Sequence, residues 1–539
     1  MRTELGNVEI ADRLSQFAAL LELAERSPFA VRAYARASEL VRSTPLSVAG
    51  LVRDGRVREL RGIGPGIESK LRELIETGDI PELAALQDEY PLELVSYGRL
   101  HGVSARRMSS IAQGLGVRKV SELEAAVAAG RLREVHGIGE KTEATIAAAL
   151  AGEAMSVRGL TVDKSRALGT EIASALDGEL AGPPRRFCEL STELSVVVPS
   201  ERADETIARF RALPSIVAVL EREERRAVGL TLDGIRVVLV VVSPDAFGSE
   251  LVRATGSPEY VEALGLLPTE SDEAGVFAAL GLPYCPPELR ELPGARPPEN
   301  LIELSDLRGD LHCHTTWSDG RASVREMASA ARDRGYAYLA ICDHTPNVGV
   351  VPGLGSDELR RQGEEIATVN DELAPFRVLR GVECDIRKDG TLDVDRDVLA
   401  ELEWVQLSLH AGQRRPRHEL TEIVTEAMRH PAVSALSHPT GRILNHRPEN
   451  ALDLDEVFSV AKATGVAVEV NGLPDRLDLS AVHIREALAA GVRLVLNSDA
   501  HSTQGLARVE LALATARKAG APEDAIVNAR PWDEIVARS

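Results

Sequence analysis

The chain is poor in residues on which several classes of protein depend. Aromatic residues make up 3% of its 539 residues, and no apolar run approaches the roughly 20 residues that span a bilayer. Its five cysteines are odd in number and show no CxxC spacing, which favours a reducing cytoplasm. Met1-Arg2-Thr3-Glu4 opens directly into amphipathic sequence, so no signal peptide is predicted. We therefore expect a soluble, cytoplasmic protein with no membrane segment.

Positive charge is also scarce. The chain has 62 Lys and Arg against 83 Asp and Glu, a net charge of −21. Residues 1–150 are nearly neutral at −1, so the remaining 389 residues carry −20. Nucleic-acid phosphates are bound by Lys and Arg, so DNA contact is expected mainly in the first 150 residues. The overall charge predicts that any affinity for DNA is modest and salt-sensitive.

The composition changes along the chain in a way that predicts several domains. Residues from about 8 to 155 indicate helices broken by glycine turns, and residues from about 160 to 260 mix helical and β-like runs such as Ile235–Val242. A proline-rich stretch, residues 283–298, follows. After about residue 305, short apolar runs alternate with helical ones, which indicates repeated βα units closed into a barrel.

Two glycine turns in the helical region each lie just before a predicted helix. The first contains Gly62, Gly64 and Gly66 and is followed by Lys70; the second contains Gly137, Gly139 and Lys141. Residues 100–104 are a degraded third copy. Glycine lets the backbone approach a ligand closely, and the amides at a helix N-terminus bind phosphate. The pattern resembles the helix-hairpin-helix motif, which contacts the DNA backbone without reading bases. Ordinary helix–helix turns are the alternative.

Most of the histidines lie in the barrel region, together with acidic residues. Ten of the 12 histidines follow residue 300. Ligand-type side chains recur at or just past the ends of the apolar runs, where a βα barrel places its active site. The predicted metal ligands are His312, His314, Asp319, His344, Glu383, His410, His438, Asp499 and His501. Alternation directs His312 and His314 to one face of a strand and Cys313 to the other.

These motifs resemble the PHP (polymerase and histidinol phosphatase) phosphoesterases. The resemblance implies a distorted, seven-stranded βα barrel with up to three Mn²⁺ or Zn²⁺ ions. It also implies a first ion held by His312, His314, Glu383 and Asp499, a second bridged by Glu383 and completed by His410 and His438, and a third held by Asp319, His344 and His501. The ions would supply hydroxide for attack on phosphorus. Glu383, His344 and Asp499 would then be catalytic, and Asp343 and Asn471 would orient ligands. Arg442 is a candidate phosphate clamp, with a structural ion pair as the alternative.

The chain as a whole is similar to the bacterial family X DNA polymerases. The similarity begins at residues 27–34, continues at residues 280–290 and extends through residues 301–310. It implies a multidomain protein with an all-α helix-hairpin-helix region (1–155), an α/β palm-like and thumb-like region (156–285), a linker (286–304) and a PHP domain (305–539). DNA is the implied partner.

The polymerase centre departs from that family. Where the family carries two aspartates on one palm strand, this chain has Glu193 and Ser195, and Val238 stands in place of the third aspartate. Two-metal phosphoryl transfer needs carboxylate oxygens for Mg²⁺. We therefore predict that templated nucleotide addition is lost.

Three functions follow for the whole chain. The first is a metal-dependent DNA phosphodiesterase that acts as a 3′→5′ exonuclease or processes abasic or blocked 3′ ends in base-excision repair. The alternatives are a small-molecule phosphatase of the histidinol-phosphate type and a non-catalytic DNA-binding scaffold. Some relatives in the family place a Schiff-base lysine near the position of Lys70, which is here more simply explained by phosphate contact.

Overall fold

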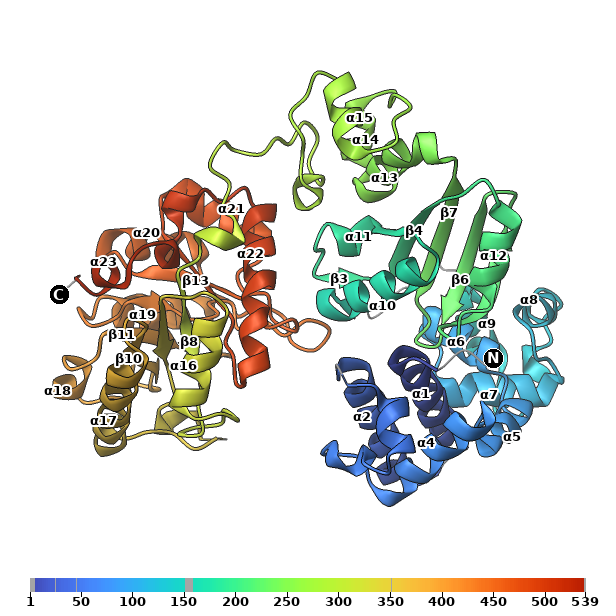
Figure 1. Cartoon of the computed structure of the whole chain (residues 1–539), viewed down its shortest axis with the longest axis horizontal. Coiled ribbons are helices and arrows are strands. Elements are labelled where there is room, and N and C mark those ends of the chain that lie inside the picture. The colour runs from blue at the N-terminus through green and yellow to red at the C-terminus, as the bar shows by residue number, and fades with distance from the viewer. Residues whose placement is uncertain (1–4, 25, 45, 151–158, 350, 538–539) are drawn as a thin grey trace. The chain divides into compact units, whose positions relative to one another are not determined.

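The computed structural model describes residues 5–24, 26–44, 46–150, 159–349 and 351–537. These residues form two compact units (Figure 1). The N-terminal unit comprises Met1–Gly159, Ala167–Ala181 and Thr192–Ala254, and the C-terminal unit comprises Leu160–Arg166, Gly182–Ser191 and Thr255–Ser539. Among the described residues, no helix combines the length and hydropathy needed to cross a bilayer. The fourfold domain division inferred from the sequence stays a prediction.

The described residues between 5 and 150 are mainly helical, as predicted. The helices are α1 (Asn7–Leu23), α2 (Pro28–Ser43), α3 (Val48–Arg53), α4 (Pro65–Thr77), α5 (Pro81–Glu89), α6 (Leu92–Leu100), α7 (Ala105–Leu115), α8 (Val120–Ala128) and α9 (Glu140–Leu150), with short 3₁₀ turns at Val57–Glu59 and Leu132–Glu134. Helix α3, a 3₁₀ turn, a glycine turn and α4 form the first hairpin, and α8, a 3₁₀ turn, a glycine turn and α9 repeat it. Apolar residues of α1 to α5, such as Leu14, Leu20 and Leu71, form one buried cluster.

A five-stranded mixed sheet follows in the N-terminal unit, in the order β2-β4-β7-β6-β5. Its strands are β2 (Glu179–Ala181), β4 (Glu193–Pro199), β5 (Ile216–Arg222), β6 (Arg226–Thr231) and β7 (Arg236–Val242). Strands β4 and β7 are parallel, and the other pairs are antiparallel. The remaining elements of the middle region are β1 (Leu160–Thr161), β3 (Leu190–Ser191), α10 (Val162–Ala175), α11 (Gly182–Arg185), α12 (Ala203–Arg211), α13 (Phe247–Thr255), α14 (Pro258–Leu264) and α15 (Glu273–Ala279).

The C-terminal unit contains the predicted barrel. A seven-stranded parallel sheet runs in chain order from β8 to β14. Its strands are β8 (Gly309–Cys313), β9 (Tyr338–Ile341), β10 (Arg377–Asp385), β11 (Trp404–Ser408), β12 (Ala435–Leu436), β13 (Ala467–Asn471) and β14 (Leu494–Asn497). The first and last strands meet where His314 N donates to Ala500 O at 2.9 Å, so the barrel is nearly closed. The predicted seven-stranded βα barrel is confirmed.

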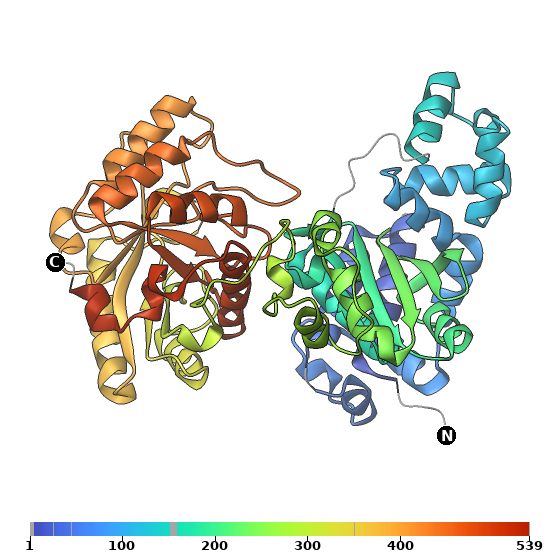
Figure 2. The same cartoon turned by 90° about the horizontal axis from the view of Figure 1, so that it is seen from above.

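Helices surround these strands (Figure 2). They are α16 (Val324–Asp333), α17 (Ser356–Leu373), α18 (Arg396–Leu399), α19 (Arg417–Met428), α20 (Leu454–Thr464), α21 (Ala481–Ala490), α22 (Val509–Lys518) and α23 (Trp532–Val536). Several begin at a side-chain cap: Ser323, Asp453 and Ser480 each accept a hydrogen bond from a backbone amide of the first turn. These caps mark the boundary between the loop that follows each strand and the helix that comes next.

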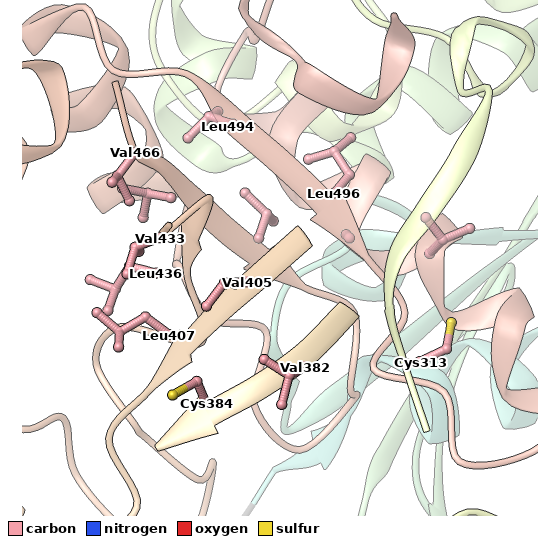
Figure 3. Close-up of a cluster of buried hydrophobic side chains, with 14 of the residues drawn as sticks. Cys313, Val382, Cys384, Val405, Leu407, Val433, Leu436, Val466, Leu494 and Leu496 are labelled. Carbon is pink, nitrogen blue, oxygen red and sulfur yellow. The ribbon is translucent and has the colours of Figure 1, made fainter. Parts of the chain in front are cut away.

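Alternation along the strands divides the barrel core into two layers. Val405 and Leu407 of β11, Leu494 and Leu496 of β14 and Cys384 of β10 belong to the larger hydrophobic cluster, which also contains buried residues of the surrounding helices (Figure 3). The inward positions at the starts of the strands form a second cluster that includes Leu379, Trp404, Ala435, Ala467 and Val495. This inner layer fills the base of the barrel.

Candidate metal centre

The candidate metal centre is built by the same two-residue alternation that builds the core. On β10 the inward face passes from Leu379 to Glu383, and on β14 and its following loop it passes from Val495 through Asn497 to Asp499. Each of these two strands thus has an apolar residue inside the barrel near its start and a polar one near its end. The apolar base excludes water from below, and the polar side chains gather at the C-terminal end of the barrel.

The structure brings the predicted ligand positions together in three overlapping groups. Within each group the candidate ligand atoms lie within 4.8 Å of one another. The groups are His314, Asp319, His344 and His501; His312, His314 and Asp499; and His344, Glu383 and His410. His438 joins the third group because its Nε2 lies 3.0 Å from Glu383 Oε1. All nine side chains therefore converge, although they come from loops and strands nearly 190 residues apart.

Glu383 lies between two sets of histidines. Its Oε1 faces His438 at 3.0 Å and His410 at 3.6 Å. Its Oε2 faces His312 at 3.4 Å and His314 at 3.6 Å, measured to their Nε2 atoms, and also lies 2.9 Å from His344 Nδ1. The Glu383 side chain is 1% exposed. A carboxylate whose two oxygens point to two ligand sets has the geometry of a bridge between two cations.

The electrostatics of the site favour ionised carboxylates. Burial alone would raise the pKa of Glu383, but His344, His312 and His410 outweigh it and hold that pKa well below its ordinary value. Asp499 is buried in the same way, and His312 and His314 likewise lower its pKa. Burial and the neighbouring His344 and His501 lower the pKa of His314 to about 3, so this imidazole is a neutral donor. Neutral imidazole and ionised carboxylate are the forms that ligate metals.

The donor set fits a divalent transition metal. The Nδ1 atoms of His314 and His410 are buried and make no hydrogen bond within the described part of the chain. Imidazole nitrogens and carboxylate oxygens suit Mn²⁺ and Zn²⁺. The neighbouring Cys313, Cys342 and Cys384 are fully buried in hydrophobic clusters, so no thiolate contributes. A buried polar atom without a partner is destabilising, and a cation would supply the missing interactions.

Two of these positions also have strained backbones. His438 has φ of +22° and Asp499 has φ of +51°, in the left-handed region that non-glycine residues rarely adopt. Strain of this kind costs about 1–3 kcal/mol per residue and persists where the surrounding structure over-determines it. At His438 the backbone N–H donates to Glu469 Oε2 at 2.7 Å, which holds the turn in place.

Glu469 is the main residue that the sequence prediction missed. It is fully buried, and its Oε1 lies 2.7 Å from His312 Nδ1. It also accepts hydrogen bonds from Gln406 at 2.9 Å and Asn497 at 2.8 Å. A carboxylate on Nδ1 directs the Nε2 of His312 toward the ligand group and keeps that atom free. The sequence signal for Glu469 is the two-residue alternation on β13, which places it on the same face as Asn471.

We expect Glu469→Gln to weaken metal binding without unfolding the barrel. The amide keeps the shape of the side chain but no longer holds His312 as a charged acceptor, and loss of such a partner lowers metal affinity about 10- to 100-fold. Isothermal titration of the metal-free protein with Zn²⁺ measures the change. Glu401→Gln, an exposed barrel carboxylate, is the control. Equal Zn²⁺ affinity in both variants would show that Glu469 has no part in orienting His312.

Asn471 and Asp343 lie where an orienting role requires. Asn471 Nδ2 donates to Asp499 Oδ2 at 2.9 Å, while Asp499 Oδ1 faces His314 Nε2 at 3.2 Å. Asp343 accepts from the backbone N–H of Thr315 at 2.8 Å and from its hydroxyl at 2.6 Å. These bonds fix the loop between His314 and Asp319.

Arg442 has partners that differ from those of a phosphate clamp. Its Nε donates to the carbonyl of Arg476 at 2.9 Å, and its Nη2 donates to the carbonyl of Leu477. The residue is 7% exposed, and its Nη1 lies 3.6 Å from Glu449. A guanidinium engaged in this way holds two loops together and has little capacity left for a substrate phosphate. The structure therefore favours the alternative, a structural arginine.

The two predicted DNA-contacting turns have exposed, open backbones. Gly62 and Gly137 have φ of +117° and +84°, which explains the need for glycine there. At Gly64, Gly66 and Gly139 the explanation is different. A Cβ atom at these positions would meet no atom within 4 Å in the described chain beyond the adjoining residues. The space beside these three glycines is therefore open to solvent. Lys141 is exposed beside the second turn.

Lys70 is held by two carboxylates. Its Nζ lies 3.0 Å from Glu73 and 3.4 Å from Glu82. Burial alone would lower the pKa of Lys70, but these two partners outweigh it and raise that pKa above its ordinary value. A Schiff-base nucleophile must be a neutral amine, so this environment opposes a lyase role.

The palm positions lie side by side on the sheet. Ser195 of β4 pairs in register with Val238 of β7, and Glu193 pairs with Arg236. The Arg236 guanidinium lies 3.5 Å from Glu193 and 3.0 Å from Glu221. The three positions thus offer one carboxylate, which is already paired with an arginine.

Comparisons with known proteins agree with this architecture. Residues 5–80 match the helix-hairpin-helix domain family, and residues 310–471 match the PHP domain family. The chain is 31% identical to the DNA polymerase/3′-5′ exonuclease PolX of Bacillus subtilis (strain 168) over 563 aligned positions, which cover 98% of each protein. It is also 29% identical to a probable phosphatase of Acetivibrio thermocellus, but over 42% of this chain and 95% of that protein. A probable phosphatase of Thermoanaerobacter sp. (strain X514) is 28% identical over 41% of the chain.

Proposed function

The chain belongs to the PolX family of bacterial DNA polymerase/3′-5′ exonucleases, and from this membership we propose that its barrel is a metal-dependent DNA phosphodiesterase acting as a 3′→5′ exonuclease. Processing of abasic or blocked 3′ ends in base-excision repair is part of the proposal. The observation that carries it is the convergence of nine ligand-type side chains around Glu383.

The chain's own residues prepare the site for phosphodiester hydrolysis. Two or three bound cations would supply a hydroxide from water near neutral pH and offset the charge of the phosphate oxygens. Ser408 donates to Glu383 Oε1, and Asn471 donates to Asp499 Oδ2, so each carboxylate is fixed in orientation before substrate arrives. Asp319 and His501 are 24% and 30% exposed, which leaves this edge of the centre open to substrate. Such preorganisation is what charge stabilisation in a transition state requires.

A small-molecule phosphatase is the second candidate. The relatives described as probable phosphatases align over 42% and 41% of this chain, a length close to that of the barrel, which favours a phosphatase activity for the barrel taken alone. The N-terminal unit argues against it, since its two open hairpin turns suit a DNA backbone. The cytoplasmic location predicted from the cysteines and the choice between Mn²⁺ and Zn²⁺ stay predictions.

A panel of substrates tests the proposed function. Purified protein with Mn²⁺ is incubated with 5′-labelled single-stranded DNA, an abasic duplex and histidinol phosphate, with and without chelator. We expect stepwise shortening of the labelled DNA from its 3′ end and little release of phosphate from histidinol phosphate. Rapid hydrolysis of histidinol phosphate alone would favour the phosphatase, and retention of DNA with no hydrolysis would favour the scaffold.

We expect the double variant Gly64→Ala/Gly139→Ala to fold normally but to bind DNA about 10-fold more weakly. Neither methyl group meets protein atoms, and Gly64 has an extended φ of −89° that alanine adopts freely. Each methyl group instead occupies the space through which a phosphate would approach the helix N-terminus. Fluorescence anisotropy in the presence of chelator measures the affinity, and the melting temperature reports the fold. Unchanged affinity would assign the two turns a purely structural role.

A further inference from the structure

The segment that follows the candidate ligand His410 is unusually basic. Residues 409–418 contain Arg414, Arg415, Arg417 and two histidines, with no carboxylate among them. They lie in the part of the chain that carries nearly all of the acidic excess. A stretch of one sign in a region of the opposite sign has a local electrostatic role, because exposed charges interact over about 8–10 Å at moderate salt.

The fold places this segment at the mouth of the metal centre. Strands β10 and β11 are parallel neighbours over five register pairs, from Gly381 with Trp404 to Asp385 with Ser408. Their following loops therefore leave the same end of the barrel, and each begins directly after candidate ligands. Glu383 is on the first strand, and His410 follows the second.

The two loops are tied together through arginine. Arg415 Nη2 donates to the carbonyl of Lys388 at 2.6 Å. Gln413 Nε2 donates to the carbonyl of Leu409 at 2.8 Å, and Gly412, with φ of +75°, turns the chain between them. The loop is thereby folded back against its neighbour, with Lys388 and Arg414 on the same rim of the site. We call Lys388, Arg414, Arg415 and Arg417 the basic rim.

Three of the four cations of the basic rim, Lys388, Arg414 and Arg417, are exposed and can contact an outside ligand. Lys388 and Arg414 are exposed, and neither forms an ion pair with any residue that the structure describes. Arg417 pairs with Asp453 at 3.0 Å but remains 64% exposed. This contrasts with Arg442 on the same end of the barrel, whose guanidinium is buried against backbone carbonyls.

We propose that the basic rim binds the phosphates of a DNA strand upstream of the bond being cleaved, and so selects a polynucleotide over a substrate with one phosphate. This inference rests on the proposed exonuclease function. A strand carries a phosphate at every nucleotide, so cations beside the metal centre contact phosphates that a small phosphoester lacks. The rim gives affinity for the backbone and no sequence preference.

The test compares two phosphodiesters in the full-length protein with Mn²⁺: a 5′-labelled single-stranded oligonucleotide and the p-nitrophenyl ester of thymidine 5′-monophosphate. The variant is Lys388→Ala/Arg414→Ala. Its matched control is Arg332→Ala/Arg429→Ala, which removes two exposed cations from the ends of α16 and α19 at the opposite end of the barrel. Michaelis constants are measured over a series of salt concentrations.

We expect the rim variant to raise KM for the oligonucleotide about 10- to 100-fold, with kcat nearly unchanged, and to hydrolyse the ester like wild type. Two lost contacts should also reduce the slope of log KM against log salt by about 1.4, because each single-strand phosphate contact contributes about 0.7. The control variant should match wild type on both substrates.

Three results would overturn the proposal, and they are distinguishable. If wild type shortens the oligonucleotide and the rim variant does so with the same KM and salt slope, the exonuclease function stands and the rim has no role. If the rim variant hydrolyses both substrates more slowly by the same factor, the rim residues act on the metal centre itself. If wild type hydrolyses the ester but not the oligonucleotide, the exonuclease function fails, and the rim proposal falls with it.

Discussion

Replacing Glu383 by alanine should reduce Mn²⁺-dependent hydrolysis by about 10³-fold or more. The two oxygens of this carboxylate face both histidine sets, at 3.0 Å from His438 and 3.4 Å from His312. Without it, two cations could no longer be held at a fixed separation. Metal-assisted charge stabilisation contributes several kcal/mol, and each 1.36 kcal/mol is a factor of ten in rate.

Two variants separate the charge of Glu383 from its packing. Glu383→Gln fills the same buried space and can still accept from Ser408, but its amide nitrogen cannot ligate a cation. We therefore expect Glu383→Gln to lose activity as completely as Glu383→Ala while retaining a wild-type melting temperature. Labelled-DNA shortening is the assay, and the exposed-site variant Glu401→Gln is the control. Hydrolysis that survives in both Glu383 variants would belong to another site.

The metal centre could be predicted from sequence because its geometry is local to each strand end. In a parallel barrel, the last inward residue of every strand lies at the same end of the barrel. The apolar runs before Glu383 and before Asp499 therefore predict that both side chains lie at that end. The apolar run at residues 378–382 lies within β10, Arg377–Asp385, and the apolar run at residues 405–409 overlaps β11, Trp404–Ser408. These apolar runs and the strands of the structure differ by a few residues at their ends.

Hydrogen-bond partners that lie far away in the sequence could not be predicted from these local patterns. The alternation on β13 places Glu469 on the same face as Asn471, but nothing in that segment identifies His312, 157 positions away, as its partner. Arg442 follows the sequence Pro439-Thr440-Gly441 beside His438, which suits a substrate contact, but the fold turns it toward the carbonyls of Arg476 and Leu477. The local sequence pattern predicts whether a side chain points into the barrel or away from it. The partners that the side chain contacts depend on the tertiary structure.

The palm should show no templated nucleotide addition. Two-metal phosphoryl transfer needs carboxylate oxygens on two adjacent strands, and here the paired positions are Ser195 and Val238. The hydroxyl of Ser195 is a weak ligand for Mg²⁺, and valine is none. Loss of two carboxylates, each worth several kcal/mol of charge stabilisation, places the rate on the order of 10⁴-fold or more below an intact centre.

Glu193 alone cannot restore this centre, because Arg236 already pairs with it and is itself shared with Glu221. The decisive assay is primer extension with Mg²⁺ or Mn²⁺ in the Glu383→Ala background, where the barrel cannot degrade a newly extended primer. We expect no extension above the level of the Glu383→Ala/Glu193→Ala double variant on any template. Template-matched incorporation by the single variant that disappears in the double variant would contradict the prediction. It would mean that Glu193 exchanges Arg236 for a cation once nucleotide binds.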